Sequence, residues 1–312
     1  MNIIEHKLKS MFNIKSEFVE QSGSLYKDWK RRAKIWLKVM KGRGPAAHLY
    51  RDYYSPAPRN WNNLPSGNVY EKLIAKNEAA YLSYVKTCAQ YHDHFANIPV
   101  EQANTTDPFW SNPAFSPLDS LVLYSLIAHN NPSVYMEVGS GNSTKYARRA
   151  IKDHGLQTKI IAVEPFPRPE LEEICDELCR APAEALPVEK FAELNSGDVL
   201  FIDNSHRSFQ NSDVTFFFTE ILPNLKPGVI YGIHDIFLPN DYPGEWAMRF
   251  YNEQYLLMMY LLGGAGGDSI LFPVAYMSYR KEVEETLLGG NGKGAPWGNE
   301  PLQGGAFWMV KA

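Results

Sequence analysis

The chain has 312 residues, of which 45% are hydrophobic and 21% are charged, and its formal net charge is −4. This composition is typical of a globular protein with room for one large domain, or for a core domain with a smaller addition. Because Lys and Arg do not outnumber Asp and Glu, the totals give no electrostatic reason to expect a nucleic-acid partner.

Cysteine and hydrophobic patterns predict a cytoplasmic protein. Three cysteines are too few for a disulfide scaffold and favour a reducing compartment. Met1–Ser10 lacks the apolar stretch of a signal peptide, and the longest apolar stretch, Tyr255–Leu262, is far too short for a membrane span. Cys175 and Cys179 stand one turn apart in a segment predicted as helix, where a half-buried face explains them better than metal binding does.

The first 110 residues predict a helical extension, separate from a main domain over 111–312. Ser24–Lys41 carries an apolar stripe and a basic face, which favours a helix packed on the main domain over one bound to a membrane or partner. Gly42–Ser66 is rich in Pro, Gly and Asn and predicts an irregular connector. Val69–Asn97 predicts a long helix. These N-terminal helices are also the candidate interface of a homodimer.

From Ser133 onward, short apolar runs alternate with amphipathic stretches. The predicted strands are Val134–Val138, Lys159–Val163, Asp198–Ile202, Val229–Ile233, Ile270–Tyr276 and Ala306–Val310. The predicted helices are Thr144–His154, Pro169–Arg180, Asp213–Leu222 and Trp246–Leu262. This alternation predicts an α/β fold with a mostly parallel sheet and helices on both faces. Because such sheets bind ligands outside the carboxyl ends of their strands, the residues that follow each strand are the candidate site.

A glycine-rich turn follows the first predicted strand, in Glu137-Val-Gly-Ser-Gly-Asn-Ser-Thr144. A dinucleotide site favours a third glycine where Thr144 stands and a neutral residue in place of Glu137. An acid at Glu137 suits a cationic ligand, such as S-adenosyl-L-methionine (SAM), better than a diphosphate, although a helix-capping or salt-bridging acid is the alternative. Glu164 ends the second strand and suits the ribose hydroxyls of either ligand. The turn therefore favours SAM.

Four motifs together resemble class I SAM-dependent methyltransferases: the glycine turn, Val-Glu164-Pro, Val-Leu-Phe-Ile-Asp203-Asn-Ser-His206 and Leu-Lys-Pro-Gly228-Val-Ile. Their spacing is most similar to the subgroup called methyltransferase family 24, from about Phe115 to the C-terminus. The resemblance implies a Rossmann-like sheet of seven strands whose last strand, near Gly304–Lys311, is antiparallel. It also implies that SAM binds at Glu137, Gly139, Ser140, Gly141, Ser143, Thr144, Glu164 and Asp203. The segment Asn112–Asp119 resembles one that precedes the first strand in this subgroup, and we expect part of it to line the cofactor site.

Acid–base candidates follow two of the predicted strands. Asp203 and His206 come after Asp198–Ile202, whereas His234 and Asp235 come after Val229–Ile233. Methyl transfer to oxygen or nitrogen usually needs a group that takes a proton, and we expect Asp203, His206 and His234 to act there, with one of the histidines as general base. All four residues could instead hold a divalent metal. Related sugar-directed O-methyltransferases have an aspartate where this chain has a histidine, which argues against Mg²⁺ and leaves room for a transition metal.

A loop rich in proline and aromatic residues, Phe237–Trp246, follows the second of these pairs. It is predicted to bind the acceptor or to act as a lid, unless its aromatic side chains fill the core. Arg207 and Arg249 could pair with an anionic acceptor or form surface salt bridges, and the sequence does not separate the two.

The function predicted from these patterns is methyl transfer from SAM to an O or N atom of a small or medium organic acceptor. One alternative is a metal-dependent hydroxylase on the same fold, because His234–Asp235 also suits iron. A second is a SAM-binding partner module without catalysis. A dehydrogenase is disfavoured by Glu137 and Thr144.

Overall fold

The computed structural model describes residues 57–60, 63, 67–288 and 294–312, within the compact unit Pro56–Ala312. The predicted helix Ser24–Lys41 and most of the predicted connector lie outside the described residues. Among the described helices, none combines the length and the apolar character that crossing a bilayer requires. The domain boundary near residue 110 and the homodimer stay predictions.

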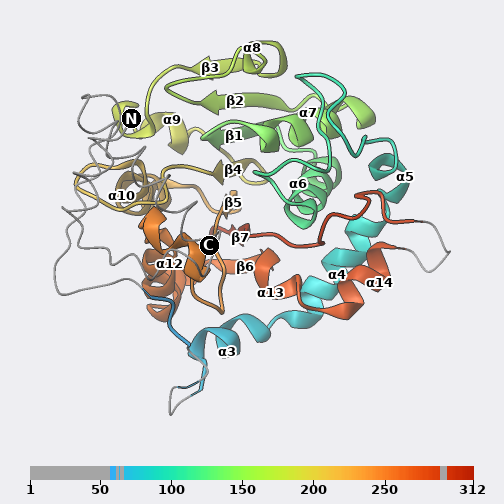
Figure 1. Ribbon diagram of the computed structural model, residues 1–312. Helices are drawn as coiled ribbons and strands as arrows, with labels where there is room; N and C mark the ends of the chain where they lie inside the picture. Colours follow the sequence, from blue (N-terminus) through green and yellow to red (C-terminus); the bar gives the residue numbers. More distant parts are fainter. Residues whose placement is uncertain (1–56, 61–62, 64–66, 289–293) are drawn as a thin grey trace, which may run out of the picture. The chain divides into compact units, whose positions relative to one another are not determined.

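One sheet of seven strands forms the centre of this unit (Figure 1). The strands are β1 (Val134–Val138), β2 (Lys159–Val163), β3 (Glu177–Cys179), β4 (Val199–Ile202), β5 (Ile230–Ile233), β6 (Ser269–Pro273) and β7 (Phe307–Val310). Their order is β3-β2-β1-β4-β5-β7-β6, and only β7 runs antiparallel to its neighbours. The predicted α/β class, the seven strands and the antiparallel last strand are confirmed.

The register of the parallel strands brings their carboxyl ends to one edge. Val138 of β1 pairs with Val163 of β2 and with Ile202 of β4, and Ile202 pairs in turn with Ile233 of β5. The next residue along each strand is therefore a neighbour of the others at this edge: Gly139, Glu164, Asp203 and His234. Strand pairing alone thus gathers the glycine turn and the acid–base candidates.

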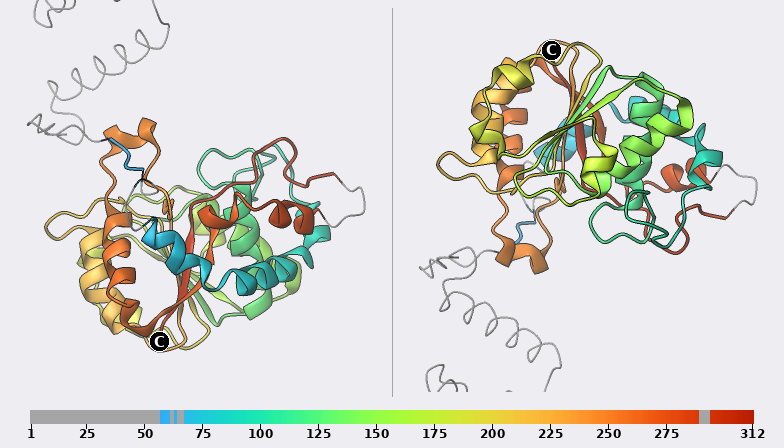
Figure 2. Two further views of the ribbon diagram at one scale, coloured as in Figure 1. Left: turned by 90° about the horizontal axis from the view of Figure 1, so that it is seen from below. Right: turned by 90° about the horizontal axis from the view of Figure 1, so that it is seen from above.

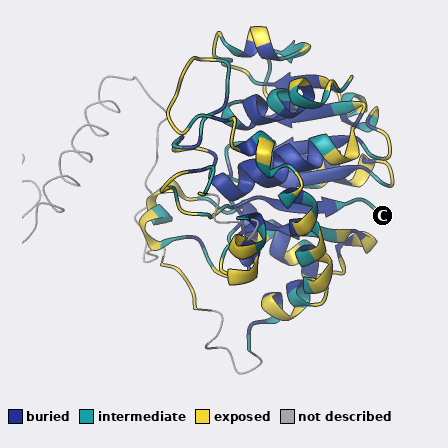
Figure 3. Ribbon diagram, turned by 90° about the vertical axis from the view of Figure 1, so that its right-hand side faces the viewer, coloured by how far each residue is buried: buried dark blue, intermediate teal, exposed yellow. Residues whose placement is uncertain are grey.

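Helices cover both faces of the sheet (Figure 2). On one face lie α6 (Pro117–Asn130) and α7 (Asn142–His154), which pack against each other. On the other lie α10 (Asp213–Phe216), α11 (Leu222–Asn224) and α12 (Glu253–Leu262), with a π-helical turn, Phe217–Ile221, between the first two. The strands and the sheet-facing sides of the helices are buried, and exposed residues gather in the loops (Figure 3).

The remaining helices are short, except α4 with its 12 residues. They are α3 (Val69–Ala75), α4 (Glu78–Ala89), α5 (His92–Phe95), α8 (Leu171–Ile174), α9 (Glu189–Ala192), α13 (Val274–Met277) and α14 (Lys281–Leu287), with 3₁₀ turns at Ala183–Ala185, Gly244–Arg249 and Ala265–Gly267. The predicted long helix over Val69–Asn97 is therefore three helices. Its breaks fall at Asn77 and Tyr91, which hold non-helical backbone angles.

Two other predicted helices were partly wrong. Pro169–Arg180 forms one turn, α8, and then strand β3, because Cys175 is extended and Asp176 accepts a hydrogen bond from the Ile160 amide of β2 at 2.7 Å. Cys175 and Cys179 consequently do not share a helix face. Trp246–Leu262 is interrupted because Phe250 adopts a left-handed φ of 56°, so that α12 begins only at Glu253.

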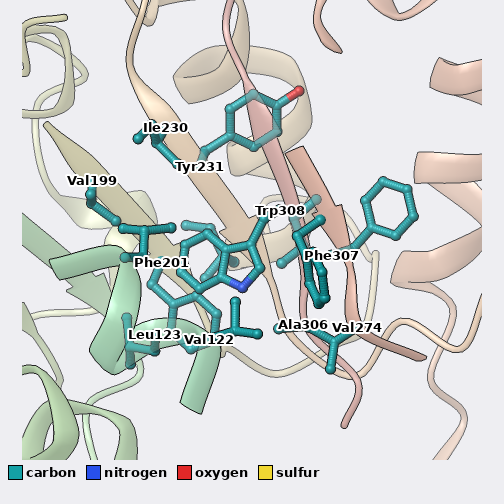
Figure 4. Packing of buried hydrophobic residues seen from close by; sticks show 14 of the residues in the cluster. Val122, Leu123, Val199, Phe201, Ile230, Tyr231, Val274, Ala306, Phe307 and Trp308 are labelled. Atoms are coloured by element: carbon teal, nitrogen blue, oxygen red, sulfur yellow. The ribbon is translucent and has the colours of Figure 1, made fainter. Parts of the chain in front are cut away.

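A tight aromatic contact fixes β7 in the sheet (Figure 4). Trp308 stacks on Phe201 of β4, with ring centroids 5.0 Å apart. Between them lies Gly232 of β5, where a Cβ atom would come within 2.6 Å of the Trp308 ring. A larger residue at 232 would expel the indole, so this glycine lets β7 pack closely beside β5. The segment just before β7 is thereby held at the edge where the parallel strands end.

Candidate active site

The two glycines of the turn after β1 have different surroundings. Gly139 has a left-handed φ of 85°, and a Cβ atom there would lie 1.7 Å from the carbonyl oxygen of Asp203. The turn therefore touches the end of β4. A Cβ on Gly141 would meet only the Arg168 guanidinium, at 3.8 Å. Gly141 thus leaves open space beside the start of α7, into which a ligand can fit.

Glu137 is fully buried beneath this turn. It accepts hydrogen bonds from the Tyr135 hydroxyl, at 3.0 Å, and from Thr144, whose hydroxyl in turn accepts the Gly141 amide at 3.0 Å. Burial raises the pKa of Glu137 to about 7, although hydrogen bonds from Ser143 and Thr144 oppose the shift. Glu137, Ser143 and Thr144 therefore face the protein and hold the turn in shape.

Two of the predicted cofactor residues could contact a ligand. Glu164 is only half-buried, and the hydroxyl of Ser140 lacks a hydrogen-bond partner in the described part of the chain. Glu164 is half-buried at the end of β2, and one of its oxygens accepts the Phe166 amide at 2.8 Å. The hydroxyl of Ser140 is buried without a hydrogen-bond partner among the described residues. The first turn of α7 carries no acidic residue of its own. These features fit SAM, whose ribose would bond Glu164 and whose carboxylate would face the start of α7.

The four predicted acid–base residues do converge, and they alternate as rings and carboxylates. His206 Nε2 lies 3.3 Å from Asp203 and 3.3 Å from Asp235. His234 Nδ1 lies 3.2 Å from the same Asp203 oxygen and 3.5 Å from Asp235. Both histidines are buried, whereas 27% of the Asp203 side chain is exposed. Asp203 therefore lies between two imidazole rings and is also reachable by a ligand.

Two further carboxylates lie behind these rings, and both are fully buried. Asp119, on α6, lies 3.3 Å from His234 Nε2 and accepts the backbone amides of Gly305 and Ala306 before β7. Glu253, at the start of α12, lies 2.9 Å from His206 Nδ1. All four ring nitrogens thus face carboxylate oxygens.

This arrangement favours protonated imidazoles. Burial would lower the pKa of both histidines, but hydrogen bonds to Asp203 and Glu253, with the negative charge of Asp235, raise the pKa of His206 to about 10. The charges of Asp203 and Asp235 raise the pKa of His234 well above its ordinary value. Burial would likewise raise the pKa of Asp203, yet the two histidines hold it well below the usual range. These shifts favour two protonated imidazoles on either side of an ionised Asp203.

The backbone at the cluster is strained. His206 and Asp235 adopt left-handed φ values of 57° and 55°, which cost non-glycine residues energy. The His206 loop is held by α12, because the Asn252 amide donates to the His206 carbonyl at 2.9 Å and Asn252 accepts the Ser208 amide at 2.6 Å.

The aromatic loop after β5 packs beside His206. The Tyr251 ring lies 4.7 Å from the His206 ring, and Trp246 packs edge-on against Tyr251 at 5.7 Å. Gln254 of α12 ties the loop down by accepting the Phe237 amide at 2.6 Å and donating to Asn240. The loop thus forms a fixed wall that reaches from the cluster toward solvent.

Comparison with known proteins agrees with this geometry. Residues 136–236, from β1 to just beyond β5, match the family model described as a methyltransferase domain. This stretch holds both the glycine turn and the four acid–base candidates. This stretch, about a third of the chain, is thus similar to a methyltransferase domain.

Solved structures and curated proteins add little to this. A methyltransferase of Podospora anserina bound to S-adenosylhomocysteine (SAH) is 14% identical, with 77% of this chain and 95% of that one covered and a TM-score of 0.40. An O-methyltransferase of Bacillus cereus in complex with SAH is 17% identical, with 73% and 91% covered and a TM-score of 0.37. At these TM-scores neither structure informs the site. No curated protein matches the chain.

Two residues of the acid–base cluster were not predicted from the sequence. Asp119 lies in a segment expected only to line the cofactor site, and Glu253 was not singled out at all. Each is an acid in the first turn of a largely apolar helix, a position that acids commonly occupy, so the sequence carried little signal for either.

The predicted metal set does not form a metal-binding group. In the part of the chain that the structure describes, no three His, Cys, Asp or Glu side chains are arranged to hold a metal ion. The ring nitrogens of His206 and His234 face carboxylates at hydrogen-bonding distances.

Proposed function

We propose that the domain methylates an O or N atom of a small or medium organic acceptor at the edge where β4 and β5 end. The observation that carries this proposal is the contact between the Gly139 turn and the carbonyl of Asp203. It joins the SAM-binding turn directly to the acid–base cluster, so a methyl donor on the turn and an acceptor at Asp203 would be neighbours.

The proposed cofactor site has an outer and an inner part. Glu164, Ser140 and the open space at Gly141 would touch SAM. Glu137, Ser143 and Thr144 would act from beneath, by fixing the turn and by placing negative charge below a cationic ligand. When bound, SAM supplies an electrophilic methyl group on a sulfonium sulfur.

Asp203 is the proposed base. A hydroxyl becomes strongly acidic as its oxygen bonds to the methyl carbon, because an oxonium forms, so a carboxylate with a low pKa suffices to take that proton. An amine acceptor would instead become an ammonium, which can lose its proton to water after the transfer. His206 and His234 would keep Asp203 ionised until it takes the hydroxyl proton and hold its position. This differs from the expectation of a histidine base, because the surrounding carboxylates raise the pKa of both imidazoles and so favour their protonated form. No step of the proposal needs a metal.

Isothermal titration with SAM, SAH and NAD, repeated on Glu164→Ala, tests the cofactor site. We expect micromolar binding of the two adenosyl ligands, no binding of NAD, and at least tenfold weaker binding by the variant.

An acceptor screen that follows SAH release, run with and without EDTA, tests the reaction. Equal turnover in both runs is expected, and a loss with EDTA would contradict the metal-free mechanism. Bound iron with oxygen consumption would favour the hydroxylase, and SAM binding without turnover on any acceptor would favour the partner module.

A further inference from the structure

Two guanidinium groups beside the proposed acceptor site have no acidic partner among the described residues. Arg148, Arg149, Arg180 and Arg280 each form an ion pair with an Asp or Glu side chain. Arg207 and Arg249 form none within the described part of the chain. In a chain with a net charge of −4, two unpaired arginines in one place are unexpected.

Both groups are held in place without using up their charge. The Arg249 guanidinium stacks on the Trp246 ring, 3.7 Å from its centroid. The Arg207 Nε donates to the Arg249 backbone carbonyl at 2.7 Å, which ties the two residues together. Stacking occupies the face of a guanidinium and leaves its in-plane N–H donors available for an anion.

Tyr251 connects this pair to the acid–base cluster. The guanidinium carbons of Arg207 and Arg249 lie 5.4 Å and 5.5 Å from the Tyr251 ring centroid. The same ring lies 4.7 Å from the ring of His206. Both positive charges are therefore one aromatic ring away from the residue that contacts Asp203.

We propose that Arg207 and Arg249 bind an anionic group of the methyl acceptor, a carboxylate or a phosphate, and so select acceptors that carry one. The inference rests on the proposed function, because it places the acceptor at Asp203. Paired guanidiniums match the geometry of both groups, and the aromatic wall of Trp246 and Tyr251 suits a planar body between the anion and the reacting atom. An acceptor of this class would reach Asp203 with its hydroxyl or amine while the arginines hold its other end.

The test uses benzoate, phenyl phosphate and the neutral benzyl alcohol as probes, titrated into SAH-loaded protein. We expect both anions to bind at least tenfold more tightly than the alcohol, and Arg207→Gln with Arg249→Gln to remove that difference. Tighter binding of benzoate would identify a carboxylate, and tighter binding of phenyl phosphate would identify a phosphate. A wild type that does not prefer the anions, or a double variant that keeps the preference, would overturn the proposal.

A matched control removes two positive charges elsewhere. Lys86→Gln with Lys281→Gln, on α4 and α14, should leave anion binding within about twofold, because both side chains are exposed and lie outside the site elements. Arg249→Lys keeps the charge but loses the planar fork, so intermediate binding is expected if the double variant is unstable. If the wild type does not bind SAH, that result counts against the proposed function. The preference for anionic probes tests the role of the two arginines separately.

Discussion

The two halves of the site are built in opposite ways. The cofactor half comes from one stretch of chain, β1, its glycine turn and the end of β2, so that Glu137, Gly139 and Glu164 lie within 28 residues of sequence. The acid–base half is assembled from distant segments. The carboxylate of Asp119 contacts a ring 115 residues away and an amide 186 residues away.

The two halves also differ in what holds their charges. Beneath the turn, Glu137 receives hydrogen bonds from neutral hydroxyls, and burial pushes its pKa upward. At the ends of β4 and β5, carboxylates face imidazoles, and the pKa of Asp203 is pushed downward. Glu137, with neutral partners, is thus kept partly neutral, whereas Asp203, between two imidazoles, is kept ionised.

The contact between the two halves gives the largest expected effect. Gly139→Ala would place a methyl group 1.7 Å from the Asp203 carbonyl oxygen and would strain a left-handed backbone. We expect the free energy of unfolding to fall by about 4 kcal/mol or more. Gly141→Ala is the matched control, because its methyl group meets only the end of Arg168, and it should fold normally. Urea titrations of both variants measure this, and equal stabilities would refute the close contact.

Removal of the shared charge from the acid–base half should have the next largest effect. Asp203→Asn keeps the size of the side chain but takes the negative charge from between His206 and His234. We expect turnover to fall about 10²–10⁴-fold, and the pKa of His206 to fall from its raised value of about 10. Kinetics on the acceptor from the screen and NMR titration of the imidazole rings report the two effects.

Asp213→Asn is the control for that change. Asp213 accepts the Ser205 amide at 2.8 Å in the same loop but forms no contact with either histidine. Its substitution should change turnover by no more than a few-fold. If the loss in Asp203→Asn were matched by an equal loss of SAM affinity, Asp203 would be a cofactor ligand and not the base.

The same contrast explains how much the sequence could predict. Most strands, the edge where they end and the glycine turn follow from local patterns of apolar residues and glycine, and these predictions of fold were confirmed. The predicted strand Ile270–Tyr276 was wrong in part, because the strand ends at Pro273 and helix α13 begins at Val274. Strand β3 was missed because it has only three residues, all half-buried, and pairs with β2 alone. Glu172 and Glu173 are helical, in α8, but after them the open edge of β2 pairs with the chain and makes it a strand.

Sequence patterns could bring His206 and His234 to one edge but not their partners. Asp119 and Glu253 reach the rings only because α6 and α12 pack on opposite faces of the sheet, which spacing along the chain does not encode (Figure 2). Without these carboxylates, each ring had a free nitrogen, and a histidine base or a metal ligand was the natural hypothesis. The structure changes that hypothesis because it supplies a second acceptor for each ring.

Glu137→Gln tests the charge beneath the turn, with the smallest expected effect. A carboxyl group whose pKa is raised to about 7 in the folded state binds its proton more tightly when folded than when unfolded. Its contribution therefore favours folding at low pH and is lost as pH rises through 7. Glutamine keeps the shape without titrating, so the stability of the variant relative to wild type should rise by up to about 3 kcal/mol between pH 4.5 and pH 8. Urea unfolding across this range gives the difference at each pH. If the unfolding free energies of wild type and variant ran parallel across this pH range, Glu137 would ionise as easily in the folded protein as in the unfolded chain. A full negative charge would then lie beneath the proposed SAM site.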